Sequence, residues 1–305
     1  MSEAMRDAFG KKLAELGATH PELVVFDADV SSSTKSAYFG KAFPDRFYNV
    51  GVAEANMVDI AAGMATSGYH PVVNAFAIFL ALKATDQIRN TICYNNLPVI
   101  IAGAYGGLSD SFDGASHQAI TDIAIMRALP NMQVIVPGDA KQAEQALEYA
   151  LEQSGPVYIR LNRNAIPDLP ASEKIGTVCT TSGSDVTIAA NGITARYANE
   201  AAALLKKEGI TAEVLSVPVV KPLDVQALKD SVEKTGKLLC VEEHVLFGGF
   251  SSAVSEAFMK EGISCRFDAI GIEDVFTETG PYEPLLAKYG ISAENIAERA
   301  KKLCK

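Results

Sequence analysis

Short apolar runs rich in valine and isoleucine alternate with segments of helical periodicity along the whole chain. In the first half, apolar side chains at helical spacing predict helices over residues 2–16, 53–67, 77–93, 118–128 and 139–152. Between them, β-rich runs predict strands at residues 23–26, 47–50, 71–75, 98–103, 132–136 and 157–161. Buried strands that alternate with helices are typical of a parallel sheet covered on both faces. This half is therefore predicted to be a doubly wound α/β domain with a mainly parallel sheet.

A segment without periodicity follows, and a second series of strands and helices begins after it. Residues 164–172 contain two prolines, which favours a linker, and we place it at residues 166–182 between domains of residues 1–165 and 183–305. In the second half, strands are predicted at residues 185–190, 212–217, 237–241 and 265–270. Helices are predicted at residues 194–207, 224–234, 250–261 and 292–303. The predicted fold class is α/β, with two doubly wound domains.

Composition and charge narrow the kind of protein. Of 305 residues, 48% are apolar and 21% charged, as in ordinary globular proteins. The net charge is −10 and no basic run occurs, which argues against nucleic acid or a membrane surface as a partner. The five cysteines form no CxxC pair, which favours a reducing compartment. Without a signal-peptide pattern or an apolar run of about 18 residues, we expect a cytoplasmic protein with no membrane-spanning helix.

Polar and aromatic side chains follow the predicted strands of the first half, where open α/β sheets bind ligands. In chain order these residues are Asp27, Ser31, Glu54, Phe76, Asp113, His117, Arg160 and Arg163. No histidine pair at ligand spacing, GxGxxG loop, Walker A loop or GxSxG elbow occurs. A zinc enzyme, a nicotinamide dehydrogenase, a P-loop kinase and a serine hydrolase are therefore disfavoured, and no metal ligands are predicted in this chain.

Glu54 lies at the start of the predicted helix 53–67, and the residues behind it are almost wholly apolar. An acid in the first turn often does no more than interact with the exposed N–H groups, which is worth about 0.3–1 kcal/mol. No basic residue lies near Glu54 in the sequence, however, and a carboxyl in apolar surroundings tends towards its protonated form. Such a carboxyl can share a proton with a ring nitrogen, which makes Glu54 a candidate catalytic and cofactor-binding residue.

Two aromatic residues lie three positions apart where a strand is predicted to meet a helix. Phe76 and Phe79 can each bury about 150–250 Å² of surface, either in the core, which their spacing alone favours, or against a planar ring.

The loop of residues 103–117 contains four glycines and ends at His117. A long loop of small residues after a buried strand is more often functional than not. At the start of the predicted helix 118–128, His117 could transfer a proton or simply cap the helix. Arg6, Arg160 and Arg163 could bind phosphate or carboxylate as forks, or form ordinary surface ion pairs.

Six segments together resemble the C-terminal half of a transketolase, and the resemblance runs over nearly the whole chain. They are Gly51–Glu54, Asn74–Phe79, Asp113–Gln118, Leu129–Met132, Gly155–Arg160 and Glu242–Gly249. Each is weak alone, and only the set is specific. The resemblance implies a pyrimidine-binding domain followed by a transketolase C-terminal domain, in an enzyme that uses thiamine diphosphate.

Families of this kind also need a pyrophosphate-binding domain, whose Gly-Asp-Gly signature and following asparagine hold Mg²⁺ and the diphosphate. The chain contains no such signature. The resemblance therefore implies a split enzyme in which the Mg²⁺ ligands lie on a separate N-terminal subunit. It also implies that this chain associates with that subunit and with itself.

The resemblance assigns cofactor contacts by position. Glu54 is similar to the glutamate that hydrogen-bonds the ring nitrogen N1′ of the aminopyrimidine. Phe76 and Phe79 match rings that line and stack on the pyrimidine, and Asp27 matches an acid near the thiazolium. Leu82 departs from the pattern, because a further aromatic residue is expected there.

Substrate contacts are implied in the same way. Asp113 and His117 resemble residues that bind sugar hydroxyls, and His117 is also a candidate catalytic residue. Arg6, Ser31 and Arg163 match positions that hold substrate phosphate. The loop departs from the family pattern at residues 111–112 and 115–116, and this bears on sugar specificity rather than on cofactor binding.

The expected function is that of a C-terminal transketolase subunit, which moves a two-carbon ketol unit from a ketose phosphate to an aldose phosphate. One alternative is the β-subunit of an oxo-acid dehydrogenase or a deoxyxylulose phosphate synthase-like enzyme. Another is a non-catalytic homologue that binds a partner but no cofactor.

Overall fold

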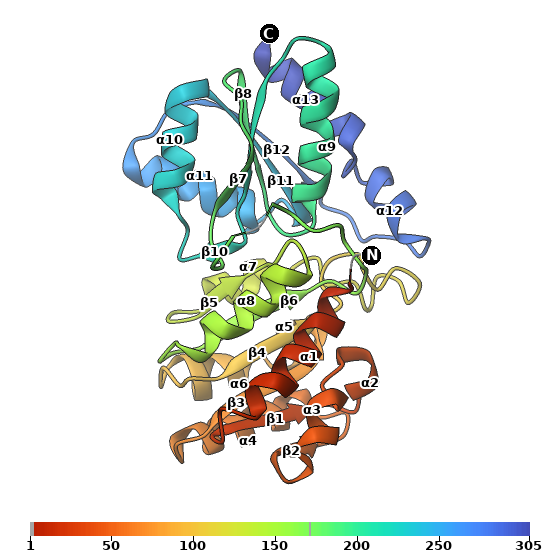
Figure 1. Cartoon of the computed structure of the whole chain (residues 1–305), viewed down its shortest axis with the longest axis vertical. Coiled ribbons are helices and arrows are strands. Elements are labelled where there is room, and N and C mark those ends of the chain that lie inside the picture. The colour runs from red at the N-terminus through yellow and green to blue at the C-terminus, as the bar shows by residue number, and fades with distance from the viewer. Residues whose placement is uncertain (1–2, 171) are drawn as a thin grey trace.

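Two α/β units, each built on its own sheet, stack end to end in the computed structural model (Figure 1), which describes residues 3–170 and 172–305. The first sheet has seven strands in the order β10-β5-β6-β4-β3-β1-β2. They are β1 (Leu23–Asp27), β2 (Phe47–Asn49), β3 (His70–Phe76), β4 (Ile100–Ala104), β5 (Gln133–Ile135), β6 (Val157–Leu161) and β10 (Val219–Lys221). All neighbouring strands are parallel except β10, which pairs with β5 in the antiparallel sense.

Helices cover both faces of this sheet, which explains why its strands read as continuous apolar runs. On β1, Leu23 and Val25 belong to the core that also contains residues of α1 (Met5–Gly17) and α8 (Ala140–Leu151). Val24 and Phe26 belong instead to the core on the opposite face, beside α4 (Glu54–Thr66). The alternation follows from the two-residue side-chain period of a strand.

Two helices predicted for the first half differ from the structure. The predicted helix 118–128 begins only at Asp122, as α7 (Asp122–Ala128), because residues 118–119 are held by other partners. The Ala119 carbonyl accepts a hydrogen bond from the Gly107 N–H, and the Gln118 side chain donates to the Glu278 carbonyl. His117 is therefore not at the start of a helix, as the sequence pattern suggested, but in the preceding turn.

The predicted helix 77–93 is divided into α5 (Ala77–Lys83), α6 (Thr85–Gln87) and a π-helical segment (Ile88–Cys93). The break falls at Ala84, whose ψ of 7° is not helical. The Thr85 hydroxyl donates a hydrogen bond to the Ala81 carbonyl, a local contact that bends helices. Short helices that the periodicity did not reveal complete this half: α2 (Ser31–Thr34), α3 (Ala37–Ala42) and a 3₁₀ turn (Pro44–Arg46).

The second sheet has five strands in the order β12-β11-β8-β9-β7. They are β7 (Val178–Thr181), β8 (Val186–Ala190), β9 (Ala212–Ser216), β11 (Lys237–Val245) and β12 (Arg266–Ile272). Only β7 is antiparallel to its neighbour, and it lies inside the segment predicted as a linker. Five helices cover the faces: α9 (Thr194–Lys207), α10 (Val225–Thr235), α11 (Phe250–Glu261), α12 (Tyr282–Lys288) and α13 (Ala293–Cys304).

A segment of the second half completes the first sheet. After β9 the chain crosses to β5 and forms β10, which Figure 1 shows at the junction of the two units. Lys221, at the end of β10, donates hydrogen bonds to the carbonyls of Arg127 at 3.0 Å and Leu129 at 2.6 Å. The two units are therefore joined by main-chain pairing as well as by side chains. Among the described residues, no helix is long and apolar enough to cross a membrane.

Candidate active site

Glu54 is the first residue of α4, and only 4% of it is exposed. Both of its carboxylate oxygens lie 3.3 Å from Lys83 Nζ, which also sits 4.4 Å above the ring centre of Phe79. No basic residue lies near Glu54 along the chain, but the fold brings Lys83, 29 positions away, next to it. Lys83 thus gives the carboxyl an ion-pair partner that the apolar helix does not supply. Lys83 was missed, although it follows Phe79 by four residues, a spacing that places two side chains on one helix face.

Four rings gather beside Glu54. Phe76 ends β3, and its ring centre lies 5.9 Å from that of Phe79 and 4.6 Å from that of Tyr105. His117 stands edge-on to both phenylalanines, at 6.2 Å from Phe76 and 5.2 Å from Phe79. Both phenylalanines are only partly buried. Part of each ring is therefore exposed, and on Phe79 the exposed Lys83 ammonium lies where a planar ring would stack.

Tyr105 brings two arginines to the edge of this cluster. It has a φ of +62°, a left-handed conformation that is costly for a bulky residue and is typically retained at functional sites. Its hydroxyl accepts a hydrogen bond from Arg6, which also donates to the Ser33 carbonyl at 3.2 Å and has its Nε 3.8 Å from Asp7 Oδ2. The Arg163 guanidinium lies 5.1 Å from the Tyr105 ring centre. Two cations that the sequence placed far apart, in the first helix and after β6, thus converge on one ring.

The loop after β4 supplies two acids next to these arginines. Asp110 is fully buried, and its Oδ1 lies 3.3 Å from Arg163 Nη1. Burial raises the pKa of Asp110 to about 6, and the negative charge of the nearby Asp113 adds to this. Asp113 itself is exposed. His117 Nδ1 and the Ser116 hydroxyl share a hydrogen bond of 2.9 Å, whose direction depends on the tautomer of the imidazole. Asp110 was not singled out from the sequence, although it lies in the loop that was.

Ser31 and Asp27 lie at the end of β1. Ser31 is the first residue of α2 and is partly exposed. Asp27 is fully buried and accepts hydrogen bonds from the Val30 N–H at 2.6 Å and from the hydroxyls of Thr34 and Ser36 at 2.8 Å. Burial raises the pKa of Asp27. Its carboxylate already organises the turn after β1, and its contact with a thiazolium stays a prediction.

Arg160 has a different place from the other arginines. Its side chain is 4% exposed and lies at the junction of the two units, where Nε donates to Asp122 Oδ2 at 2.9 Å. Nη2 donates to the carbonyls of Ala119 at 2.6 Å and Glu243 at 2.9 Å. Tyr158 donates to the same Asp122 oxygen at 2.6 Å. Nε and Nη2 are thus bonded within the protein, so Arg160 holds the loop and the second unit together.

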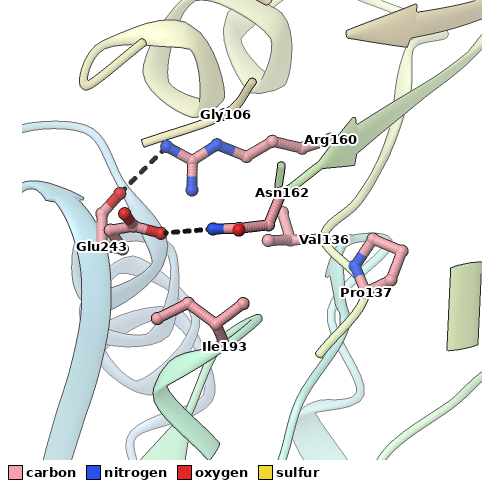
Figure 2. Close-up of a pocket in the computed structure, with 7 residues that line it drawn as sticks. All are labelled: Gly106, Val136, Pro137, Arg160, Asn162, Ile193 and Glu243. Carbon is pink, nitrogen blue, oxygen red and sulfur yellow. Dashed lines mark hydrogen bonds between the residues drawn. The ribbon is translucent and has the colours of Figure 1, made fainter. Parts of the chain in front are cut away.

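Glu243 extends this contact from the second unit (Figure 2), around a cavity of about 10 Å³. Its Oε1 accepts from the Leu108 N–H at 2.8 Å and from the Tyr282 hydroxyl at 2.9 Å. Asn162 donates to its other oxygen at 3.4 Å. The loop that carries Asp110, Asp113 and His117 is therefore fixed at its base by a side chain of the second unit.

The site thus joins an acid at a helix start, partly exposed aromatic rings, two arginines and a histidine, all at the carboxyl ends of the first sheet. Such a set can grip a flat heterocycle at Glu54 and an anionic, hydroxylated molecule beside it. Within residues 3–170 and 172–305, no group of three or more His, Cys, Asp or Glu side chains is placed to hold a metal ion.

The chain matches two family models over most of its length. The model of the transketolase pyrimidine binding domain matches residues 2–168, and that of the transketolase C-terminal domain matches residues 177–296. The chain therefore belongs to the transketolase family. The family and the α/β fold predicted from the sequence are thereby confirmed.

Within that family, two relatives of similar length are described as parts of transketolases. The chain is 39% identical to a protein of Methanocaldococcus jannaschii provisionally named transketolase C-terminal section, over 97% of this chain and 95% of that protein. A solved structure described as a split-gene transketolase, an inactive β4 tetramer, is 44% identical with a TM-score of 0.92, over 99% of this chain and 98% of that one.

A second group of relatives is longer. The chain is 36% identical to a 1-deoxy-D-xylulose-5-phosphate synthase of Symbiobacterium thermophilum, over 97% of this chain but 46% of the synthase. The chain thus spans about half the length of this relative.

Proposed function

We propose that this chain is the C-terminal subunit of a two-chain transketolase that depends on thiamine diphosphate. It would transfer a two-carbon ketol group from a ketose phosphate to an aldose phosphate. The observation that carries the proposal is the convergence of Glu54 with Phe76, Phe79 and His117 at the end of the first sheet. The Mg²⁺ and diphosphate ligands are assigned to a separate N-terminal subunit, in keeping with the missing Gly-Asp-Gly signature.

The residues present fit the pyrimidine half of the cofactor. The Glu54 carboxyl is buried at a helix start and is met in this chain by one ammonium, that of Lys83. Because Lys83 is 49% exposed and the pair is 3.3 Å long, a ring nitrogen can replace it at modest cost. When bound, thiamine diphosphate supplies a nucleophilic carbon for breaking and forming carbon–carbon bonds beside a carbonyl. Glu54 holds a proton at the ring nitrogen, and Phe76 and Phe79 orient the ring.

The remaining residues act on the sugar. Arg6 and Arg163 both contact the Tyr105 ring and present guanidinium forks for a phosphate group. His117 stands edge-on to the phenylalanines, and Asp113 lies beside Asp110, the ion-pair partner of Arg163. We assign to both the binding of sugar hydroxyls, which need acceptors and a group that exchanges protons. An aldose phosphate is thus held at its charged end while its carbonyl end faces the cofactor site.

The test is reconstitution. The chain is mixed with a candidate N-terminal subunit, thiamine diphosphate and Mg²⁺, and ketol transfer between sugar phosphates is measured. Glu54→Gln is expected to lower turnover by about 100-fold or more, because a positioned proton donor typically contributes 10²–10⁴-fold. Glu233→Gln, an exposed exchange of the same type on α10, is the control and should leave turnover unchanged. Undiminished turnover of Glu54→Gln would contradict the role of Glu54.

A second candidate function is a synthase that takes pyruvate as the donor. It is favoured by the 36% identity to a 1-deoxy-D-xylulose-5-phosphate synthase over 97% of this chain. The same reconstituted pair distinguishes the two functions. Turnover with pyruvate and none with a ketose phosphate would replace the transketolase proposal.

A further inference from the structure

One charged group of the site has no role in the function proposed above. Asp110 lies in the loop after β4 with none of its surface exposed. Its Oδ1 meets Arg163 Nη1 at 3.3 Å, and its Oδ2 is a buried oxygen with no hydrogen-bond partner among the described residues. A buried carboxylate is costly unless it is paired and hydrogen-bonded. A carboxylate that is only half satisfied in the middle of a site needs an explanation.

The Asp110 carboxylate balances the positive charge of Arg163. Arg6 and Arg163 lie 5.3 and 5.1 Å from the ring centre of Tyr105, so two positive charges contact one aromatic ring. The Arg163 side chain is 39% exposed, and its only ion pair among the described residues is with Asp110. Without this carboxylate, only the Tyr105 ring would hold this long and exposed side chain in place, and we expect it to leave the ring.

The contact with Asp110 leaves most of the N–H donors of Arg163 without a bond to it. It involves one nitrogen, and a guanidinium has five N–H donors. The other donors remain free for a phosphate or carboxylate oxygen. On the opposite side, the carboxyl group of Asp110 faces that of Asp113, which is exposed. One buried side chain therefore contacts both kinds of substrate-binding group, the cationic and the acidic.

We propose that Asp110 is a positioning residue of the substrate site, which fixes Arg163 against Tyr105 and orients Asp113 towards the sugar. This inference deepens the proposed function, because it concerns how the phosphorylated sugar is held. Its kinetic test rests on that function. Asp110 acts through its neighbours and does not itself touch the cofactor. The loss of Asp110 should therefore weaken binding of the sugar phosphate more than it slows the chemical step.

The kinetic test uses the reconstituted enzyme with a phosphorylated aldose as acceptor. Asp110→Ala is expected to raise KM for this substrate by about tenfold while kcat changes by less than about threefold. Asp110→Asn keeps an oxygen acceptor of the same shape but not the charge, and should give a smaller rise. Asp230→Asn, an exposed exchange on α10, is the matched control and should change neither constant. A fall in kcat at unchanged KM would contradict the inference, as would wild-type values for Asp110→Ala.

A double-mutant cycle tests whether Asp110 acts through Arg163. In an Arg163→Ala background, Asp110→Ala is expected to cause little further rise in KM, because the shared contact is already lost. Independent effects of the two substitutions would overturn the inference. Asp110→Asn serves in the same cycle if the alanine variant does not fold.

A crystal structure of the isolated Asp110→Ala chain gives a readout that needs no activity. The Arg163 guanidinium is expected to have left the face of Tyr105, and an unmoved Arg163 would overturn the inference. If the wild-type pair transferred no ketol group at all, the proposed function would fail while this crystal structure still tested Asp110. If the wild-type pair were active and Arg163 did not move, only the inference would fail.

Discussion

Single residues in the loop after β4 have conformations and neighbours that few side chains tolerate. Gly107 has a φ of +65°, and a Cβ placed on it would overlap the Glu243 carboxyl group. Glu243 cannot move aside easily, because it accepts hydrogen bonds from Leu108 and Tyr282. Gly107 is therefore needed both for its backbone conformation and for the close approach of the second unit to the loop.

Gly107→Ala is expected to destabilise the chain by about 3 kcal/mol. About 1–2 kcal/mol comes from the left-handed conformation and the rest from displacement of a buried, hydrogen-bonded carboxylate. Thermal unfolding of the isolated chain measures this. Gly209→Ala is the matched control, since its φ is +79° and nothing lies within 4 Å of its Cβ, and it should cost only the backbone term. Equal losses for the two variants would show that the contact with Glu243 adds nothing.

At the scale of helices and strands, α11 begins without a capping side chain of its own. Its N-cap residue is Gly249, and Glu242 on β11 takes over the capping. Glu242 accepts from the N–H groups of Phe250 at 2.6 Å and Ser251 at 2.9 Å, and from the Ser251 hydroxyl at 2.5 Å. A strand thus satisfies N–H groups that a helix start leaves without partners.

Glu242→Ala is expected to destabilise the second unit by about 2–5 kcal/mol, because two buried N–H groups lose their acceptor. Asp224→Ala is the comparison, as Asp224 caps α10 through the Ala227 N–H at 3.1 Å in an exposed setting. Loss of an ordinary cap costs about 1 kcal/mol. Urea unfolding of the two variants measures the difference, and a smaller loss for Glu242→Ala than for Asp224→Ala would exclude this capping role.

Elements with a clear apolar stripe and a definite stop were predicted well from the sequence. The bounds of α9 and α11 agree with the prediction, and a glycine follows each within two residues. Elements determined by distant contacts were not predicted. The start of α7 depends on partners of Gln118 in residues 277–278, and β10 exists only because β5 offers an edge.

The same distinction holds for the site. Glu54, Phe76, Phe79 and His117 could be named because each follows a predicted strand, and the fold brings the four together. Lys83 shares a helix face with Phe79, but its pairing with Glu54 and that of Asp110 with Arg163 join residues 29 and 53 positions apart, which local spacing does not encode. The assigned roles of Arg6, Ser31, Asp27, Asp113 and Arg163 towards cofactor and substrate stay predictions.

For the whole molecule, the junction between the two units contains a buried ionic network beside an apolar core that both units share. Arg160, Asp122 and Glu243 are buried there with their partners. Burial raises the pKa of Glu243, to about 7, even though the positive charge of Arg160 opposes this. Folding buries the Glu243 carboxyl at this junction and is therefore coupled to the uptake of a proton by Glu243.

This coupling predicts the pH dependence of stability. Since the pKa of Glu243 is about 7 when folded and 4.5 as a model value, the folded chain keeps a proton between these pH values that the unfolded chain has lost. The contribution of Glu243 to stability therefore falls as pH rises from about 4.5 to 7, by an amount on the order of 2–3 kcal/mol.

Glu243→Gln removes this titration. The stability of the variant relative to wild type should improve between pH 5 and pH 8, measured as the difference in Tm. Glu233→Gln, exposed on α10, should show a constant difference over this range. A constant difference for Glu243→Gln would mean that Glu243 does not bind a proton in the folded chain near neutral pH.

The strand β10 has a consequence for recombination between relatives. In a chimera with residues 1–182 from one protein and the remainder from another, β5 would come from the first protein and its partner β10 from the second. A mismatch there would leave the edge of β5 with free N–H and C=O groups, which attract other chains. Exchangeable modules of this protein are therefore defined by the strand that crosses between them, and a swap at the apparent linker would succeed only where residues 219–221 travel with a compatible β5.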